Sequence, residues 1–585
     1  MARQKRGKAT SSDRPRRDRS NSKSAGRAGR PRKAQSKRKD GARNIAVAKQ
    51  AESLHEATAT KRVVNQKPKL RRDSHRGSVE ASEAASLLLR HDFRDSEIVI
   101  GLVGAVGTEL TTVISILRQR FEVAHYNVKV IEIAEEVIPL VTPIEEVDSE
   151  DAYAVLMAKM DAGNRARKES QENSVLALGT AMQISKVHEP GESPPKYAPR
   201  TVHIVKSLKH PAEVHRLREI YSEGFFLLGV HADRSRRENH LIKKRRMSKP
   251  NATKLIERDE DEAYSWGQRV TDSFHLSDFF IRLDSNADRL QNSVWRIVDI
   301  LLGHPHRTPM FDEFAMFLAF TASLRSADLS RQVGAVIARD EQIVATGAND
   351  CPRFGGGLYW PDWIGNDISD HPEGRDHTRG EDSNKIEQQK MLDEVVELSG
   401  LTESAREDFR RKLERSRIRD LTEFGRVVHA EMEALLSCAR SNTSTAGATL
   451  YSTTFPCHNC AKHIIAAGIQ RVVYIEPYLK SKAGDFYSDS ISLGYESRIG
   501  DRRAKADRLR FEPFFGVGPR RFFDLFSMRL GSGREIRRKE KSGKAIDFSL
   551  ESSYLRLQML PYSYLELEAV ACRRFEELVH GGTEV

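Results

Sequence analysis

The chain has 585 residues, of which 39% are hydrophobic, and a formal net charge of +12. That length predicts about two to four domains, and the sequence has no apolar run of about eighteen residues, which excludes a conventional membrane-spanning helix. We also expect a cytoplasmic protein, because the first residues lack the apolar core of a secretion signal and the five scattered cysteines argue against a disulfide framework.

Positive charge is concentrated at the N-terminus. Residues 1–50 carry 18 Lys or Arg and 3 Asp, a balance of +15, so the rest of the chain carries −3. Because this segment has almost no large apolar side chains, we predict that residues 1–95 form a disordered basic tail and linker. Two interpretations of the tail stay open: a contact with nucleic acid through phosphate neutralisation, or a solvated extension without a defined role.

A first folded domain is predicted over residues 96–305. Residues 98–103 form an apolar run typical of a buried strand, a glycine-containing turn follows, and residues 109–121 have a helical pattern. Helical stretches separate the further strand-like runs, which indicates a parallel α/β sheet. This order resembles the P-loop nucleotide-kinase fold. The further runs are residues 128–133, 201–205, 225–230 and 278–283.

The turn after the first strand contains Gly104, Gly107 and Thr108. A strand, a glycine turn and a helix present backbone N–H groups to phosphate. A complete P-loop ends in Gly-Lys-Ser/Thr, whereas Gly107 is followed by Thr108 and Glu109, with no Lys nearby. Phosphoryl transfer would lack a main source of electrostatic stabilisation. We therefore expect a regulatory nucleotide at this domain, with an empty scaffold as the alternative.

The strongest motif lies further along the chain. His429-Ala-Glu431 is followed by Pro456-Cys457-His-Asn-Cys460, the order that zinc-dependent nucleobase deaminases use. His429, Cys457 and Cys460 would ligate zinc and leave the fourth position to water. Glu431 would carry protons between that water, the cytosine ring and the departing amine. The predicted reaction is hydrolysis at C4 of cytosine, which releases ammonia.

The local pattern around the motif predicts its geometry. A helix is expected from residue 427, a strand over 448–453 and a second helix over 457–467, bounded by Pro456 and Gly468. Both metal-bearing segments would lie at helix N-termini, where the dipole favours thiolate. A redox Cys pair and a structural zinc site are the alternatives. A structural site would need a fourth ligand, and none is obvious beyond His458 and His463.

Residues 331–337, 345–350, 424–436 and 451–477 resemble the deoxycytidylate deaminase family, and the resemblance extends over about residues 308–515. It implies a cytidine-deaminase-like α/β/α sandwich around a five-stranded sheet. It also implies that Asn349, at the end of the second strand, binds the sugar. The alternative is that Asn349 is only a turn former beside Gly347 and Asp350; we favour the sugar contact.

The predicted deaminase-like domain covers residues 306–528 and contains a charged insertion, residues 351–424, far longer than an ordinary loop. We expect the insertion to shape the substrate pocket or a contact in a homo-oligomer. Cys351, His371 and His377 lie in or beside it, but scattered residues in a charged loop seldom converge on a metal. Residues 529–585 are predicted to be a linker and a helical C-terminal extension, with the helix over 549–580.

A kinase-like domain joined to a deoxycytidylate-deaminase-like domain resembles the anti-phage dCTP deaminases of bacteria, most closely over residues 424–429 and 453–463. The resemblance implies deamination of dCTP, dCMP or both, which would deplete a pool that phage replication needs, and an activity restrained until infection. One alternative is a deaminase that edits single-stranded DNA or RNA and is anchored by the basic tail, which the acidic body argues against. Another is a non-catalytic nucleotide sensor with structural zinc, which Glu431 argues against.

Overall fold

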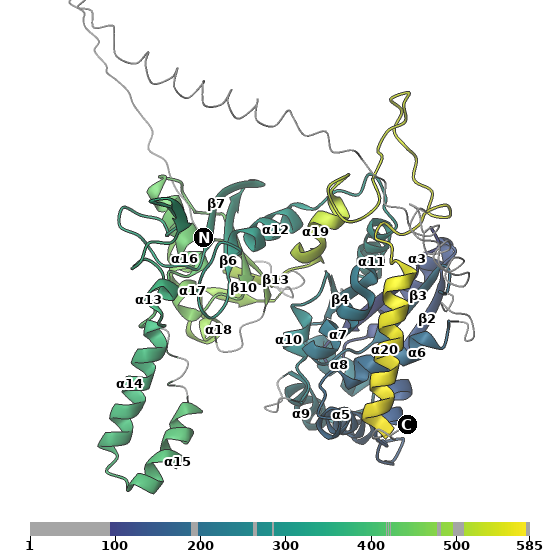
Figure 1. Cartoon of the computed structure of the whole chain (residues 1–585), viewed down its shortest axis with the longest axis horizontal. Helices are drawn as coiled ribbons and strands as arrows, with labels where there is room; N and C mark the ends of the chain where they lie inside the picture. Colours follow the sequence, from purple (N-terminus) through teal and green to yellow (C-terminus); the bar gives the residue numbers. More distant parts are fainter. Residues whose placement is uncertain are drawn as a thin grey trace, which may run out of the picture. The chain divides into compact units, whose positions relative to one another are not determined.

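The computed structural model contains two six-stranded β-sheets, each with its own helices (Figure 1). The predicted basic tail, residues 1–95, lies outside the described residues except for its last two positions. Its predicted contact with nucleic acid therefore falls outside the described residues as well. No helix in the described part of the chain is long and apolar enough to cross a membrane. The described residues are 94–188, 197–260, 266–283, 286–416, 418, 421, 423–476, 481–494 and 508–580.

The first sheet has the strand order β14-β5-β4-β1-β3-β2. The five strands from β5 to β2 in this order are parallel to one another, as predicted. The strands are β1 (Ile98–Val103), β2 (Asn127–Glu132), β3 (Thr201–Lys206), β4 (Phe225–His231) and β5 (Phe279–Arg282). All six residues of β1 are buried, because helices cover both faces of a parallel sheet.

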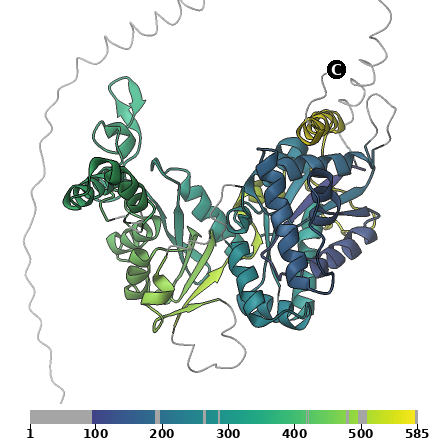
Figure 2. The ribbon, with the colours of Figure 1, turned by 90° about the horizontal axis from the view of Figure 1, so that it is seen from below.

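Alternate residues of β1 face two different apolar cores. Ile98, Ile100 and Leu102 pack with α3 (Leu110–Val123) and α11 (Ala287–Leu301). Val99 and Val103 face α5 (Ala152–Glu169), α6 (Val175–Ser185) and α7 (Pro211–Tyr221) on the opposite side. Figure 2 shows the helices of this domain on both faces of its sheet. The remaining helices here are η1 (Ile133–Val137), α4 (Ile138–Val141), η2 (Ser222–Gly224), α8 (Arg234–Lys243), α9 (Lys249–Glu260) and α10 (Val270–Phe274).

The second sheet has the order β12-β13-β11-β10-β6-β7. It has six strands rather than the predicted five, because the short strand β12 pairs with the outer edge of β13. The β6–β7 hairpin turns at Asp340 and Glu341, both with positive φ, which suits the twist of a two-residue hairpin. The strands are β6 (Gly334–Arg339), β7 (Gln342–Ala348), β10 (Thr449–Thr454), β11 (Arg471–Glu476), β12 (Ile491–Leu493) and β13 (Leu509–Pro513).

Helices cover both faces of the second sheet as well. On one face α12 (Phe311–Ser323) packs on Val336 and Tyr451. On the other face α16 (Ala430–Arg440) and α17 (His458–Ala466) pack on Ala335, Ile337 and Leu450. A further short helix, α18 (Ala483–Phe486), precedes β12. The described residues therefore form the predicted three-layer α/β/α arrangement.

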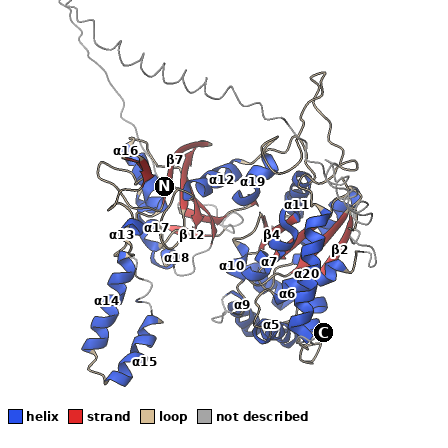
Figure 3. Cartoon of the chain, in the orientation of Figure 1, coloured by secondary structure: helices blue, strands red, loops and turns tan. Residues whose placement is uncertain are grey.

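The charged insertion has secondary structure of its own. Strands β8 (Asp362–Ile364) and β9 (Asp367–Ser369) form a hairpin, followed by α13 (Asp376–Arg379). Figure 3 shows the next two helices, α14 (Ser383–Leu398) and α15 (Glu403–Glu414), as a pair packed side by side. Cys351 and His377 have separate partners here: Cys351 Sγ lies 3.5 Å from Asp376, whereas His377 pairs with Asp370.

After β13 the chain returns to the first sheet. Strand β14 (Gly516–Val517) pairs antiparallel with β5, and α19 (Pro519–Phe526) follows it. A helix was predicted over residues 549–580, and the structure has one over the second part of this range, α20 (Pro561–His580). Residues 549–560 are not helical. Leu555 and Leu557, two positions apart, are both buried in the core of the first sheet, a spacing that extended backbone gives and a helix does not.

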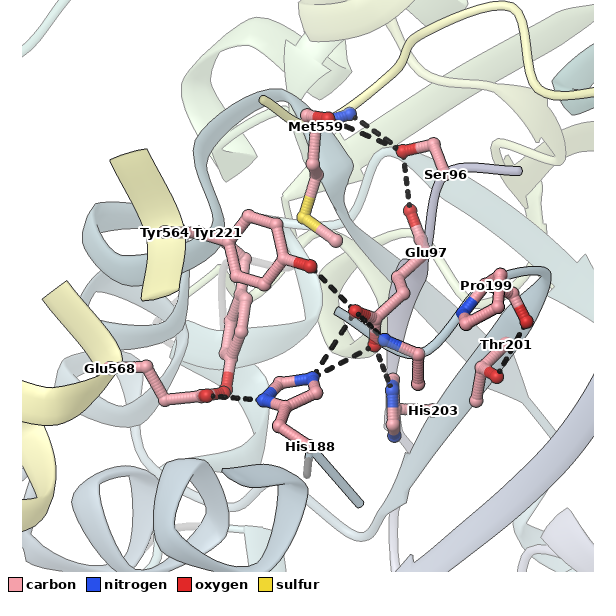
Figure 4. Close-up of polar contacts among 11 residues, drawn as sticks. Ser96, Glu97, His188, Pro199, Thr201, His203, Tyr221, Met559, Tyr564 and Glu568 are labelled. Carbon is pink, nitrogen blue, oxygen red and sulfur yellow. Dashed lines mark hydrogen bonds and ion pairs between the residues drawn. The ribbon is translucent and has the colours of Figure 1, made fainter. Parts of the chain in front are cut away.

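A buried polar network holds α20 on the first domain, beside α6 and α7 (Figures 1 and 4). Glu97 accepts hydrogen bonds from the Tyr564 hydroxyl at 2.5 Å and from His203 Nε2 at 2.7 Å. His188 lies between two carboxylates, with Nε2 3.2 Å from Glu97 and Nδ1 2.8 Å from Glu568. The network therefore connects residues that are more than 350 positions apart in the sequence.

Candidate active site

His429, Cys457 and Cys460 converge at the N-termini of two helices. His429 is the N-cap of α16, and Cys457 is the N-cap of α17. His429 Nδ1 lies 3.4 Å from Cys457 Sγ and 3.3 Å from Cys460 Sγ. The three donor atoms lie within 4.8 Å of one another. Two sulfurs and an imidazole at this spacing suit zinc, so the residues fit the ion that the sequence predicts.

The pKa values of Cys457 and Cys460 also suit a zinc site. The hydrogen bond with Cys460, together with the hydrogen bond and charge of His429, outweighs the effect of burial and lowers the pKa of Cys457 to about 3. The hydrogen bond with Cys457 in turn raises the pKa of Cys460. One thiolate is therefore already favoured at the N-terminus of α17, where its sulfur also accepts from the Cys460 backbone N–H at 3.4 Å.

Glu431 lies beside this group and is 4% exposed. Its Oε2 is 3.5 Å from Cys460 Sγ, and its Oε1 is 3.4 Å from the Ser452 hydroxyl. Burial raises the pKa of the Glu431 carboxyl. A carboxyl with a raised pKa next to a metal site can both accept and return a proton, which is what a general acid–base residue needs.

A glycine fixes the approach of α16 to the sheet. A Cβ atom at Gly347 would lie 2.2 Å from the Ala430 carbonyl oxygen and 2.6 Å from the Ala434 nitrogen. Strand β7 is thus in backbone contact with the first turn of α16. Just after β7, Asp350 forms a bridge with Val428 through backbone hydrogen bonds. These contacts place His429, the residue after Val428, over the carboxyl end of β7.

Asn349 lines the same cavity, but its amide is engaged by the backbone. Its Oδ1 accepts from the Val333 N–H at 2.6 Å, and its Nδ2 donates to the Arg331 carbonyl at 2.8 Å. The side chain therefore holds the segment that enters β6. The sugar contact implied by the family resemblance stays a prediction.

The cavity beside the zinc ligands has a volume of about 620 Å³. The insertion supplies one wall, and sequence reasoning missed these residues because their place depends on tertiary contacts. For example, the Asn384 and Gln388 side chains both donate to the Leu421 carbonyl and so hold the segment that leads into α16. The insertion residues at this wall are Asp376, Asp382, Asn384, Leu421 and Glu423.

Basic side chains also line this cavity. Arg331 and Lys482 are among its lining residues, together with Ser330. Ser330 and Arg331 precede β6, the first strand of the second sheet. In the first domain, Gly104, Gly107 and Thr108 lie between β1 and α3, as predicted. Their binding of a nucleotide stays a prediction.

Comparison with known proteins agrees with this site. A family model described as the cytidine and deoxycytidylate deaminase zinc-binding region matches residues 309–476. The deoxycytidylate deaminase of Mycobacterium phage D29 is 30% identical over 167 residues, which cover 28% of this chain and 94% of the relative. The chain belongs to the deoxycytidylate deaminase family.

Other members of the deoxycytidylate deaminase family match over shorter stretches. The deoxycytidylate deaminase of Enterobacteria phage T2 is 49% identical over 57 residues, 10% of this chain and 30% of the relative. The chain thus spans about 30% of the length of such curated relatives. Among solved structures, a dCMP deaminase from the cyanophage S-TIM5 is 19% identical, covers 36% of this chain and 100% of that chain, and has a TM-score of 0.19.

Proposed function

We propose that the second domain is a zinc-dependent hydrolase that deaminates deoxycytidine nucleotides: dCTP, dCMP or both. The observation that carries this proposal is the convergence of His429, Cys457 and Cys460 beside the buried carboxyl of Glu431, in a cavity of about 620 Å³. A structural zinc site has no use for an acid–base residue or for a cavity. Family membership supports the same chemistry.

His429, Cys457 and Cys460 would hold the zinc ion. When bound, zinc supplies an activated water for attack at C4 of cytosine. Glu431 accepts a proton from the water, holds it because burial raises its pKa, and delivers it to ring N3. It then takes a second proton, from the new hydroxyl at C4, and delivers that proton to the departing amine. The insertion would line one side of a bound nucleotide, and Arg331 and Lys482 would offer positive charge to its phosphates.

We propose that the reaction serves anti-phage defence by depleting dCTP, and that the first domain restrains it through a regulatory nucleotide. The support for this regulation is a physical connection: β14, which follows the last strand of the deaminase sheet, is itself a strand of the first sheet. A rearrangement of the first sheet would therefore reach the second through a few residues of backbone. The homo-oligomer, the cytoplasmic location and the nucleic-acid contact of the tail stay predictions.

Ammonia release tests the proposed activity. Zinc-loaded full-length protein is offered dCTP, dCMP, cytidine and a cytosine-bearing oligonucleotide separately. We expect release from dCTP or dCMP only. Glu431→Gln is expected to lower the rate by about 100-fold or more, because the proton carrier is lost.

Glu433→Gln is the matched control. Glu433 lies two residues after Glu431 in α16, pairs with Arg440 and is not among the residues that line the cavity. Its activity is expected to stay close to that of the parent protein. Release from the oligonucleotide alone would replace this proposal with polynucleotide editing. Equal rates for the parent protein and Glu431→Gln would exclude the acid–base role.

A further inference from the structure

The turn between β1 and α3, residues 104–108, already holds an anion that belongs to the chain itself. Asp259, near the end of α9, is 1% exposed. Its Oδ2 accepts from the Val106 backbone N–H at 2.6 Å. A backbone N–H at such a turn is the group that would otherwise face a phosphate oxygen. The carboxylate of Asp259 therefore takes the place of an anionic ligand.

A lysine from another segment supplies the positive charge that the turn lacks in sequence. Lys209 follows β3, which pairs with β1, so its side chain reaches the same end of the sheet. Its Nζ donates to Asp259 Oδ1 at 2.7 Å and to the Gly104 carbonyl at 3.1 Å. Its backbone N–H is held by Glu213 at 2.9 Å, at the start of α7. Lys209 is thus fixed beside the turn without being part of it.

Two further details of the turn suit a ligand that is held by its phosphate. The Thr108 hydroxyl oxygen is buried and has no hydrogen-bond partner among the described residues. Gly107 has a φ of +84°, and a Cβ atom there would lie 2.9 Å from the Arg237 carbonyl oxygen. The backbone of α8 therefore lies directly on the turn, while α9 supplies the carboxylate that fills it.

Helices α8 and α9 have an apolar cluster separate from the two cores that cover the first sheet. It contains Leu241 and Met247 from α8 and the residues after it, with Ala252, Leu255 and Ile256 from α9. Met160 of α5 completes it. Because the cluster is small and separate, α8 and α9 can shift together at less cost than an element of either main core.

We propose that the 104–108 turn and Lys209 form a site for the phosphate of a nucleotide-class ligand, and that Asp259 occupies this site as an intrachain competitor. A ligand phosphate binds there only when α9 withdraws Asp259. This inference deepens the regulatory role proposed for the first domain. Its test is direct binding, so its outcome is separate from that of the deaminase reaction.

Isothermal titration of full-length protein with inorganic pyrophosphate is the first test, with ATP in a second titration to identify a nucleotide source. Asp259→Asn removes the competing charge and is expected to bind pyrophosphate roughly tenfold more tightly or better, because the site is then open in most molecules. The double variant Asp259→Asn with Lys209→Met is expected to lose that gain. Asp288→Asn is the control, because Asp288 is exposed on α11, which packs on α3 and β5, and the change removes one negative charge without altering a hydrogen bond or ion pair of α9 among the described residues.

Hydrogen exchange in the parent protein tests the same proposal without a substitution. Without ligand, we expect the Val106 amide to be protected by Asp259. At high pyrophosphate concentration, we expect faster exchange in residues 249–260, while the Val106 amide stays protected by the bound ligand. The proposal is overturned if the parent protein and Asp259→Asn bind pyrophosphate equally. It is also overturned if the folded Asp259→Asn protein does not bind, or if exchange in α9 does not respond to pyrophosphate.

Discussion

Single residues decide whether the zinc ligands meet, and Gly347 is the clearest case. A side chain at this position would collide with the backbone of α16 at Ala430 and Ala434. Backbone atoms cannot move aside as the end of a flexible side chain can, so α16 would have to shift away from β7. That shift would carry His429, the N-cap of α16, away from Cys457 and Cys460.

Gly347→Ala is therefore expected to weaken zinc binding and to lower stability by about 1–3 kcal/mol, the usual cost of forcing atoms into a packed site. Zinc content after dialysis and the unfolding midpoint measure the two effects. Gly163→Ala is the control, because an added Cβ in α5 meets its nearest atom at 3.4 Å and a helix gains from Ala. Full zinc retention by Gly347→Ala would contradict the geometric argument.

The chemistry of the site could be predicted from its residues, but the supporting contacts could not. His429, Glu431, Cys457 and Cys460 are recognisable because metal ligation requires particular residue types at particular spacings. Asn349 was readable as a site residue or a turn former, and the structure adds backbone hydrogen bonds to Val333 and Arg331. Such contacts depend on which strand lies beside which, which no local pattern records.

At the scale of elements, long apolar strands were predicted well and short ones were not. The run 98–103 coincides with β1, because both faces of a central parallel strand are buried. Strands β12 and β14 have three and two residues, too few to show a period. The insertion was predicted only as a charged segment, and its part in the pocket wall depends on how α14 holds residue 421.

The attachment of α20 is expected to depend on pH through His188 and Glu97. Burial alone would lower the pKa of His188, but hydrogen bonds to Glu568 and Glu97 raise it from 6.5 to about 10. Burial alone would raise the pKa of Glu97, but hydrogen bonds from His188 and His203 lower it from 4.5 to about 2. Both groups therefore favour the charged form in the folded state.

His188 and Glu97 limit the stability of the first domain at opposite ends of the pH range. The stability that His188 contributes is complete below pH 6.5 and is lost as pH rises from 6.5 towards 10. The contribution of Glu97 is complete above pH 4.5 and is lost as pH falls towards 2. The unfolding temperature of the first domain should thus be highest between pH 4.5 and 6.5 and decrease both above and below this range.

His188→Gln is expected to flatten the alkaline fall, which thermal unfolding at pH 6 to 10 would measure. His304→Gln is a control, since His304 lies outside this network. A parallel pH dependence in His188→Gln and the parent protein would show that the ionised imidazole does not contribute. This network is better explained by protons than by a metal, because His203 Nε2 and Glu97 are only 2.7 Å apart, a hydrogen-bond distance.

At the scale of the whole molecule, Glu313 joins the two sheets. This residue of α12 is fully buried, and its carboxylate accepts two hydrogen bonds from Arg296 of α11, at 2.7 and 2.8 Å. It also accepts from the Val517 backbone N–H of β14 at 2.8 Å. One carboxylate, on a helix of the second domain, therefore contacts a helix of the first domain and the strand β14 that follows the last strand of the second sheet.

Glu313→Gln is expected to separate the unfolding of the two domains, because it leaves the Arg296 charge without its carboxylate and weakens the hold on β14. Calorimetry should show one transition for the parent protein and two for the variant. Glu512→Gln is the matched control: Glu512 is also buried, but its partner Arg471 lies in the same sheet, so this change should lower one transition without splitting it. If Glu313→Gln unfolds in one step, the two sheets are held together mainly by the backbone between β13 and β14, and any signal between the domains would have to travel along that segment.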